Sequence, residues 1–248
     1  AYGSIIMLGA YVGYYLMMKA GLPLAISVVG SILGAAFLCY LNERMAYSSL
    51  RKRNAASLYF MISAMGTAIF LENLVYATIG SRFYAFPEMI TQQNITFLGA
   101  SIGVLDVFAI VFSFAAIYTL HYFLQHSRIG IAIRAASYDM QVSQLNGVNI
   151  TRLVGWVFLL AGALAGLSGM FLGMKYMVYP TMGWITNKAY IAAVIGGLGS
   201  LPGAVVGGLI LGVLETLVSA YVSSVIRDVF SFSLLVVLLL VLPTGLFG

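Results

Sequence analysis

Long apolar runs alternate with short polar stretches along the chain, and several of these runs exceed about 18 residues, the length that marks a membrane-spanning helix. Such a helix crosses the hydrocarbon core of a bilayer, which is about 30 Å thick. Each run therefore predicts one crossing. The expected spans are Gly3–Met18, Leu22–Leu41, Ala56–Ile79, Gly99–Leu124, Leu153–Met174, the segment Ala189–Val222, and Val229–Leu242.

The segment Ala189–Val222 differs from the other runs because glycines and a proline interrupt it. As one straight helix it would be about 50 Å long, which is too long for a single crossing. Such interruptions occur at membrane depth where the freed backbone groups face protein or a water-filled cavity. We expect a half-helix from the outer side, a break at Gly196–Pro202, and then a fuller helix. The interrupting residues are Gly196, Gly197, Gly199, Pro202, Gly203, Gly207, Gly208 and Gly212.

Composition supports an integral membrane protein, since 62% of the residues are hydrophobic and 8% are charged. The single cysteine, Cys39, excludes an internal disulfide. The net charge of +5 does not indicate nucleic acid, because basic residues gather in two loops, Asn42–Ser57 and Gln125–Arg152. The positive-inside bias places both loops in the cytoplasm. The stretches Ser81–Thr96 and Lys175–Lys188 are then extracytoplasmic.

The chain opens at Ala1 directly into an apolar run, without a start methionine or a cleavable signal. We expect an upstream membrane segment to precede it. Because no linker rich in proline, serine or charge interrupts the chain, we expect a single membrane domain over residues 1–248. Residues 125–152 form a cytoplasmic loop within that domain.

Glycines recur along the span Leu153–Met174 at spacings that place them on one helix face. Such a stripe of small residues lets another helix approach closely. Four of them, with Gly155 before them, are predicted to pack helices together. These four are Gly162, Gly166, Gly169 and Gly173.

Three carboxylates, Glu72, Asp106 and Glu215, lie within or at the edge of apolar runs. A charge at the centre of a membrane helix costs about 2.5 to 3.5 kcal/mol on insertion scales, so each should face protein or water. Asp106 also fits an interfacial position, and Glu72 also fits a polar contact between helices. Glu215, three residues after Gly212, is the best candidate of the three to line an internal path.

The loop from His126 to Arg152 predicts a cytoplasmic helix. Ser127 is a suitable N-cap, and Asn146-Gly147 is a C-terminal signal. Such a helix could dock a partner, or it could be a solvated connector or an interfacial amphipath. The histidines, His121 and His126, lack cysteine or carboxylate companions and do not indicate a metal site.

These features together resemble a known family, the LivH-type permease subunits of branched-chain amino acid ABC importers. The likeness covers nearly the whole chain, and its most specific parts are the late glycine block and the cytoplasmic Arg-Ala stretch. The matching residues are Gly3-Ser4 with Met7-Leu8-Gly9-Ala10-Tyr11, Glu43-Arg44 with Ala46-Tyr47, Ser127-Arg128 with Gly130, Arg134-Ala135, Asp139 and Gly147-Val148-Asn149, Ala192-Ala193-Val194 with Gly196-Gly197, Gly199-Ser200, Gly203-Ala204 and Gly207-Gly208, and Pro243-Thr244-Gly245-Leu246.

The resemblance implies an all-α, polytopic helical bundle of the type II ABC importer permease kind, with broken or re-entrant helices, in the bacterial inner membrane. The chain would be a non-catalytic half of a pore. Its implied partners are a second homologous permease, two cytoplasmic ATPases, an extracytoplasmic substrate-binding protein and membrane lipid. ATP and Mg would be bound by the ATPases, because the sequence has no G-x-x-x-x-G-K-[ST] phosphate loop and needs no cofactor of its own.

The resemblance also implies roles for individual residues. One set would couple the loop to the ATPases, and another would line or gate the translocation path. The coupling set is Arg128, Gly130, Arg134, Ala135, Asp139 and Gly147, and the path set is Gly196, Gly197, Gly199, Ser200, Gly203 and Glu215.

Three other functions remain open at this point. A related importer for sugars or urea-like amides would have a similar core, because selectivity is largely delegated to the binding protein. An ion-coupled secondary transporter would also use broken helices and intramembrane acids. A membrane enzyme would need a convergent set of nucleophile, base or metal ligands, and the sequence displays no such set.

Overall fold

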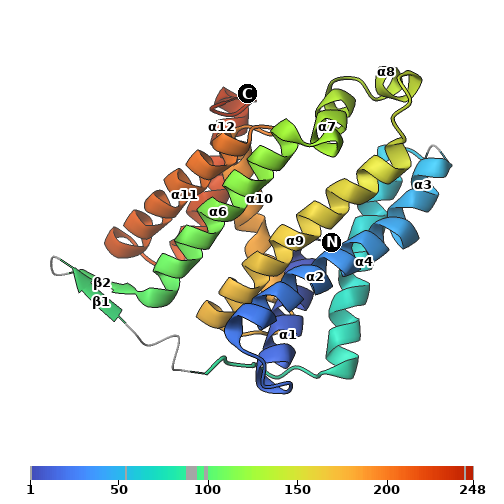
Figure 1. Ribbon diagram of the computed structural model, residues 1–248. Coiled ribbons are helices and arrows are strands. Elements are labelled where there is room, and N and C mark those ends of the chain that lie inside the picture. Colours follow the sequence, from blue (N-terminus) through green and yellow to red (C-terminus); the bar gives the residue numbers. More distant parts are fainter. Residues whose placement is uncertain (1, 54, 88–93, 98–99, 243, 248) are drawn as a thin grey trace. The chain divides into compact units, whose positions relative to one another are not determined.

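The computed structural model describes residues 2–53, 55–87, 94–97, 100–242 and 244–247. The chain forms two compact units, Ala1–Gly183 and Trp184–Gly248. Nearly all of the described backbone is helical, as expected for an all-α membrane bundle (Figure 1). The expectation of one permease domain over the whole chain stays a prediction.

The core of the first unit consists of α1 (Tyr2–Met18), α2 (Leu24–Asn42) and α9 (Ile150–Tyr176), which pack against one another. The glycine stripe of α9 faces the other two helices. A Cβ on Gly162 would lie 2.8 Å from the Ala35 carbonyl oxygen, and one on Gly166 would overlap the Ser31 carbonyl. Small residues therefore let these helices approach to backbone contact.

The other two glycines of the stripe lie closer to the end of α9. Gly169 abuts the Ile6 carbonyl of α1, and a Cβ on Gly173 would lie 2.8 Å from Val178. Ser31 joins all three helices, because its hydroxyl lies 2.6 Å from the Gly9 carbonyl oxygen and 2.9 Å from the Gly166 carbonyl oxygen. A buried hydroxyl that finds an acceptor on two neighbouring helices fixes their registers.

The helix α2 does not end where the basic cytoplasmic loop was expected. It continues through a π-helical turn, η1 (Glu43–Tyr47), into α3 (Ser48–Lys52), so that Leu24–Lys52 forms one helical run. The span expected to end at Leu41 is therefore longer than predicted, and most of the basic stretch after it is helical. The π turn accommodates one extra residue within the run and re-aims the side chains that follow it.

Beside this core, the first unit contains α4 (Ser57–Thr78), a hairpin of β1 (Asn94–Phe97) and β2 (Ala100–Gly103), and α6 (Val104–His126). The expected span from Gly99 begins too early, because strand β2 precedes α6, and Gly99 itself lies outside the described residues. Tyr84 of the expected outer loop forms a backbone bridge with Val178, at nitrogen–oxygen distances of 2.9 and 2.8 Å.

The second unit contains α10 (Thr186–Gly196), α11 (Leu201–Tyr221) and α12 (Ile226–Val241). The predicted break is confirmed, since α10 ends at Gly196 and the next helix begins at Leu201. The two helices then pack antiparallel as a helical hairpin, with Gly196 opposite Gly203 and Lys188 opposite Glu215. The start of α10 and the end of α11 therefore lie at the same end of the unit.

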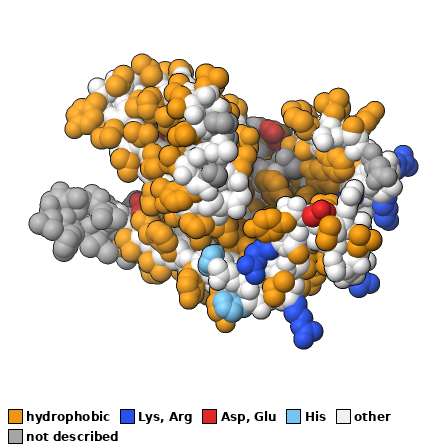
Figure 2. All heavy atoms as spheres, turned by 90° about the horizontal axis from the view of Figure 1, so that it is seen from above, with side chains coloured by type: hydrophobic (Ala, Val, Ile, Leu, Met, Phe, Trp, Pro, Cys, Tyr) orange, Lys and Arg blue, Asp and Glu red, His pale blue; other side chains and the backbone are white. Residues whose placement is uncertain are grey.

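Within the described parts of the chain, five helical runs are long and apolar enough to cross a membrane. Both α1, with 17 residues, and α12, with 16, are shorter. Figure 2 looks onto the end of the molecule that carries α3, α7 and α8 and shows basic side chains there among abundant hydrophobic ones. The five long runs are Leu24–Lys52, Ser57–Thr78, Val104–His126, Ile150–Tyr176 and Leu201–Tyr221.

Candidate ATPase-docking loop and translocation segment

The loop between α6 and α9 folds into two short helices, α7 (Arg128–Tyr138) and α8 (Met140–Leu145). Ser127 caps α7 by accepting a hydrogen bond from the Gly130 amide at 2.9 Å. The expectation of one helix from the Ser127 cap to Asn146-Gly147 is wrong, since two helices form. Asp139 follows the first helix and caps the second. Its carboxylate accepts hydrogen bonds from the backbone amides of Gln141 at 2.8 Å and Val142 at 2.9 Å.

The predicted coupling residues play different parts in this loop. Gly130 is buried where α7 meets the end of α6, and a Cβ there would lie 2.5 Å from Leu124. Arg134 donates to the Gln125 carbonyl at 3.3 Å and so ties α7 to the C-terminus of α6. Arg128 and Ala135 are exposed. These contacts attach α7 to α6 and leave its other face open.

The end of the loop is built for a sharp turn into α9. Gly147 has a φ of +84°, which glycine adopts without strain. Asn149 then caps α9, since its side chain accepts from the Arg152 amide at 3.1 Å. A short, well-ordered turn therefore connects the loop to α9, the helix that carries the glycine stripe.

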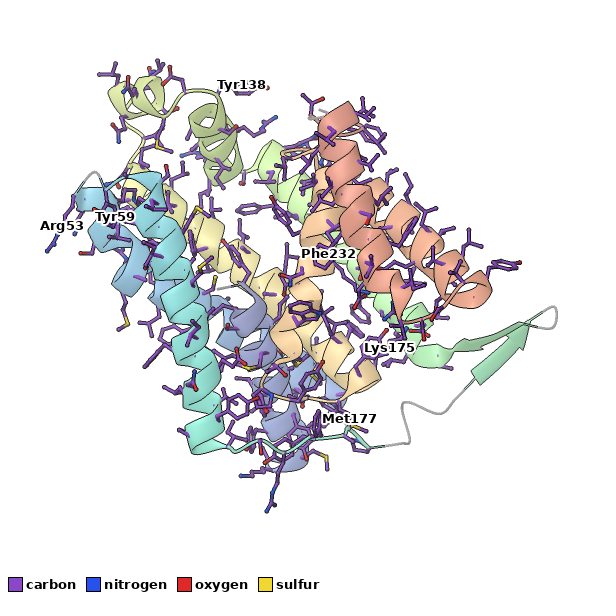
Figure 3. All side chains as sticks on the ribbon, turned by 180° about the vertical axis from the view of Figure 1, so that it is seen from behind. Arg53, Tyr59, Tyr138, Lys175, Met177 and Phe232 are labelled. Atoms are coloured by element: carbon purple, nitrogen blue, oxygen red, sulfur yellow. The ribbon has the colours of Figure 1, made fainter. Side chains whose placement is uncertain are left out.

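Sequence reasoning missed the apolar surface of this loop. Tyr138 is 93% exposed and Leu145 is 86% exposed. Figure 3 shows Tyr138 pointing away from the helices. The signal in the sequence was a large apolar residue at the last position of each short helix. The other large hydrophobic side chains exposed on the loop are Ile131, Met140 and Val142.

The break in the second unit depends on glycine conformations. Gly197 and Gly199 have φ values of +106° and +101°, which L side chains rarely adopt. Ser200 then caps α11 by accepting the Gly203 amide at 3.1 Å. All the predicted path residues except Glu215 thus form the tip of the hairpin, where the α10 and α11 backbones meet at Gly196 and Gly203.

The C-terminal tail covers this tip. The amides of Leu246 and Phe247 donate to the carbonyls of Ile195 and Gly196, both at 3.1 Å. These carbonyls are among the last of α10, and no amide of the helix itself donates to them. Gly245, with a φ of +81°, brings the tail against Gly197. The interrupted helix is therefore capped by a segment distant in sequence.

Glu215 lies in a charge cluster at the opposite end of the hairpin. Lys188 lies 3.1 Å from one of its carboxylate oxygens, and the Ser231 hydroxyl donates to the other at 2.6 Å. Lys188 also lies 2.8 Å from Asp228, and Arg227 lies 3.8 Å from Asp228. The nearby Lys188 ammonium lowers the pKa of the Asp228 carboxyl.

This cluster joins α10, α11 and α12 through two positive and two negative groups. Both Glu215 oxygens are occupied by groups of the protein, and its side chain is 14% exposed. Such an arrangement favours a structural role for Glu215. A role in the translocation path stays a prediction.

The remaining candidates are distributed over the first unit. Asp106 pairs with Lys175 at 2.6 Å and so connects the start of α6 with the end of α9. Glu72 is half-buried on α4, and Cys39 is buried and free. Among the described residues, no group of three His, Cys, Asp or Glu side chains is placed to hold a metal ion.

Comparison with known proteins agrees with this architecture. A family described as "Branched-chain amino acid transport system / permease component" matches residues 1–242. The high-affinity branched-chain amino acid transport system permease protein LivH of Escherichia coli is 38% identical, over 100% of this chain and 84% of that protein. BraD of Pseudomonas aeruginosa, of the same description, is 34% identical over 100% of this chain and 85% of that protein.

More distant similarity extends to sugar import. The fructose import permease protein FrcC of Rhizobium meliloti is 27% identical, over 85% of this chain and 60% of that protein. No solved structure matches the chain. The family match over nearly the full length, together with the long apolar helices, shows that the chain belongs to the permease components of branched-chain amino acid transport systems, multi-pass proteins of the inner membrane.

Proposed function

We propose that this permease forms half of the translocation pathway of an ATP-driven importer for branched-chain amino acids. Its partners are a second homologous permease, two cytoplasmic ATPases and an extracytoplasmic substrate-binding protein. The observation that carries the proposal is the 38% identity to LivH over the whole chain. The chain itself is not an enzyme, and ATP and Mg are bound by the ATPases.

The α7–α8 loop is the proposed contact with an ATPase. Its exposed side chains, above all Tyr138 and Leu145, offer apolar area that burial against a partner would stabilise. Arg128, Ala135 and the exposed side of Arg134 border this surface. Its polar and apolar character fits a protein interface with an aromatic anchor.

Movement of this loop would be transmitted directly to the membrane helices. Gly130 and Arg134 attach α7 to the end of α6, and Asn149 starts α9 two residues after the Gly147 turn. Because α9 contacts α1 and α2 at backbone distance, a push on the loop would move these helices together. Alternating access then follows from rigid-body rocking of the permeases, set by the nucleotide state of the ATPases.

The hairpin tip is the proposed gate of the path. The helix is interrupted at this tip, so some backbone N–H and C=O groups are not used in helical hydrogen bonds there. The tip residues are Gly196, Gly197, Gly199, Ser200 and Gly203. Such irregular backbone at membrane depth typically lines a cavity or a path. An aliphatic amino acid requires an apolar passage with some hydration for its charged ends.

Reconstitution tests this function. The full chain would be inserted into vesicles with its second permease, ATPases and binding protein, and uptake of labelled leucine, valine and fructose measured. We expect amino acid uptake that requires ATP hydrolysis and excludes fructose. Uptake of fructose in preference would support the sugar importer, and uptake driven by an ion gradient without ATPases would refute the proposal.

A further inference from the structure

A cavity of about 360 Å³ lies between α2 and α9 at the basic end of the first unit. Two guanidinium groups, a phenol and an indole line it together with small and aliphatic side chains. It therefore combines charge on one side with apolar surface on the other. The lining residues are Tyr40, Arg44, Arg152, Gly155, Trp156 and Leu159.

The two arginines of the cavity have no acidic partner. Arg44 donates to the Tyr40 hydroxyl at 3.0 Å and lies over the Tyr40 ring. Among the described residues, no carboxylate lies within salt-bridge distance of Arg44 or Arg152. Both side chains are exposed. They are free to bind an anion from outside the chain.

The carboxylate that lies near the cavity in the described structure is already neutralised. Glu43 is fully buried, and its carboxylate forms an ion pair with Arg51. Its second oxygen lies 4.0 Å from the position of a Cβ on Gly155, at the cavity wall. Because Arg51 balances Glu43, Arg44 and Arg152 give the cavity a net positive charge.

The cavity walls are preformed, and their residues have the chemistry of the cytoplasmic headgroup region. The pair α2 and α9 is held at backbone distance by the glycine stripe. Arg44 is on the stretch, and Arg152 in the loop, that the positive-inside bias assigns to the cytoplasm. Trp156, 44% exposed, lies in the second turn of α9, and tryptophan is enriched at membrane interfaces.

We propose that this cavity binds an anionic phospholipid of the cytoplasmic leaflet. The lipid phosphate would lie between the Arg44 and Arg152 guanidinium groups, with the Tyr40 hydroxyl beside it. An acyl chain would follow the apolar wall along Trp156 and Leu159. Basic cavities between membrane helices on the cytoplasmic side have the chemistry for such headgroups.

The chain contains two tryptophans, which makes the proposal directly testable. A Trp184→Phe variant keeps Trp156 as the only indole of the chain. In nanodiscs, phosphatidylglycerol with brominated acyl chains would quench Trp156 fluorescence when it occupies the cavity. At equal mole fraction we expect quenching to indicate severalfold higher occupancy than for brominated phosphatidylcholine. Equal quenching by the two lipids would overturn the proposal.

Variants test the arginines. In the Trp184→Phe background, Arg44→Gln with Arg152→Gln should remove the preference, since each basic group near the surface is worth about fivefold in binding. The matched control is Lys52→Gln with Arg53→Gln, which removes equal charge from the same end without touching the cavity lining. Figure 3 shows Arg53 pointing away from the helices. The control should keep the preference.

Each other outcome decides against the cavity. Equal loss in both double variants would mean general attraction to an anionic surface. Relief of quenching by inorganic phosphate at millimolar concentration would mean a site for the free anion. Unchanged lipid preference together with weakened ATPase retention, after Arg44→Gln and Arg152→Gln, would mean a protein contact instead.

Discussion

Truncation of the two most exposed apolar side chains of the α7–α8 loop should uncouple the permease from the proposed ATPase partner. Tyr138 and Leu145 are 93% and 86% exposed, so almost all of their surface is available to a partner. Complete burial of a large apolar side chain contributes about 1.5 to 3 kcal/mol. Taking the lower bound for each, Tyr138→Ala with Leu145→Ala removes about 3 kcal/mol, or roughly a hundredfold in affinity.

The variant should leave the permease itself folded, because neither side chain is buried within the chain. The affinity of purified ATPase for the permease in nanodiscs would be titrated, and uptake would be measured in vesicles at fixed ATPase concentration. We expect the titration midpoint to rise by about two orders of magnitude, in proportion to the lost apolar contact. Uptake should recover when excess ATPase is supplied, since the loss is one of binding.

The control is a second pair of exposed apolar side chains outside the loop. Tyr221 is 85% exposed at the end of α11, and Val225 is 82% exposed just before α12. Tyr221→Ala with Val225→Ala should leave ATPase affinity unchanged. An unchanged midpoint in the Tyr138 and Leu145 variant, or an equal shift in the control, would refute the assignment of this loop as the docking surface.

Three further predictions concern packing and the second unit. Gly166→Ala should lower the free energy of unfolding by about 1 to 3 kcal/mol, because the added methyl group overpacks against α2. Its control, Gly66→Ala, has open space around it and should be neutral or slightly stabilising. Thermal unfolding in detergent compares the two variants. Gly245→Ala should destabilise the second unit by about 1 to 2 kcal/mol, because alanine at a φ of +81° is strained, and Gly212→Ala, in open space, is its control in the same assay. Glu215→Gln should lower thermal stability while uptake persists; normal stability with lost uptake would instead place Glu215 in the path.

Local signals in the sequence were sufficient for much of the architecture. The lengths of the apolar runs predicted the long helices, because the bilayer thickness fixes how many apolar residues one crossing requires. The coincidence of glycines and Pro202 predicted the break after Gly196, and the spacing of the α9 glycines predicted one packed face. Each of these signals depends on neighbours within a few residues along the chain.

Contacts between distant residues could not be predicted in the same way. From the sequence, Asp139 could be a polar surface residue or a helix cap. It is a cap because α8 starts directly after it and directs two amides at its carboxylate. The tail at Gly245 covers the end of α10, which lies some fifty residues earlier in the chain, and no local pattern predicts such a contact. Glu215 was expected to be a path residue because it is a carboxylate in an apolar segment, three residues after Gly212. Its partners, Lys188 and Ser231, belong to other helices, so the local sequence does not reveal them.

The packing of the first unit limits how the proposed coupling can operate. At Gly166 and Gly169 the α9 backbone touches α2 and α1, and the Ser31 hydroxyl bridges Gly9 and Gly166. Sliding one helix by a single residue would drive side chains into carbonyls and break both hydrogen bonds. Close-packed interiors shift between discrete arrangements and do not deform smoothly. A force applied through α7 and α8 should therefore carry α1, α2 and α9 as one body. The compliance that the cycle needs must lie elsewhere. Among the described residues, α4 and α6 are the most loosely held long helices of the unit, since each has a single buried residue, Val75 in α4 and Leu105 in α6.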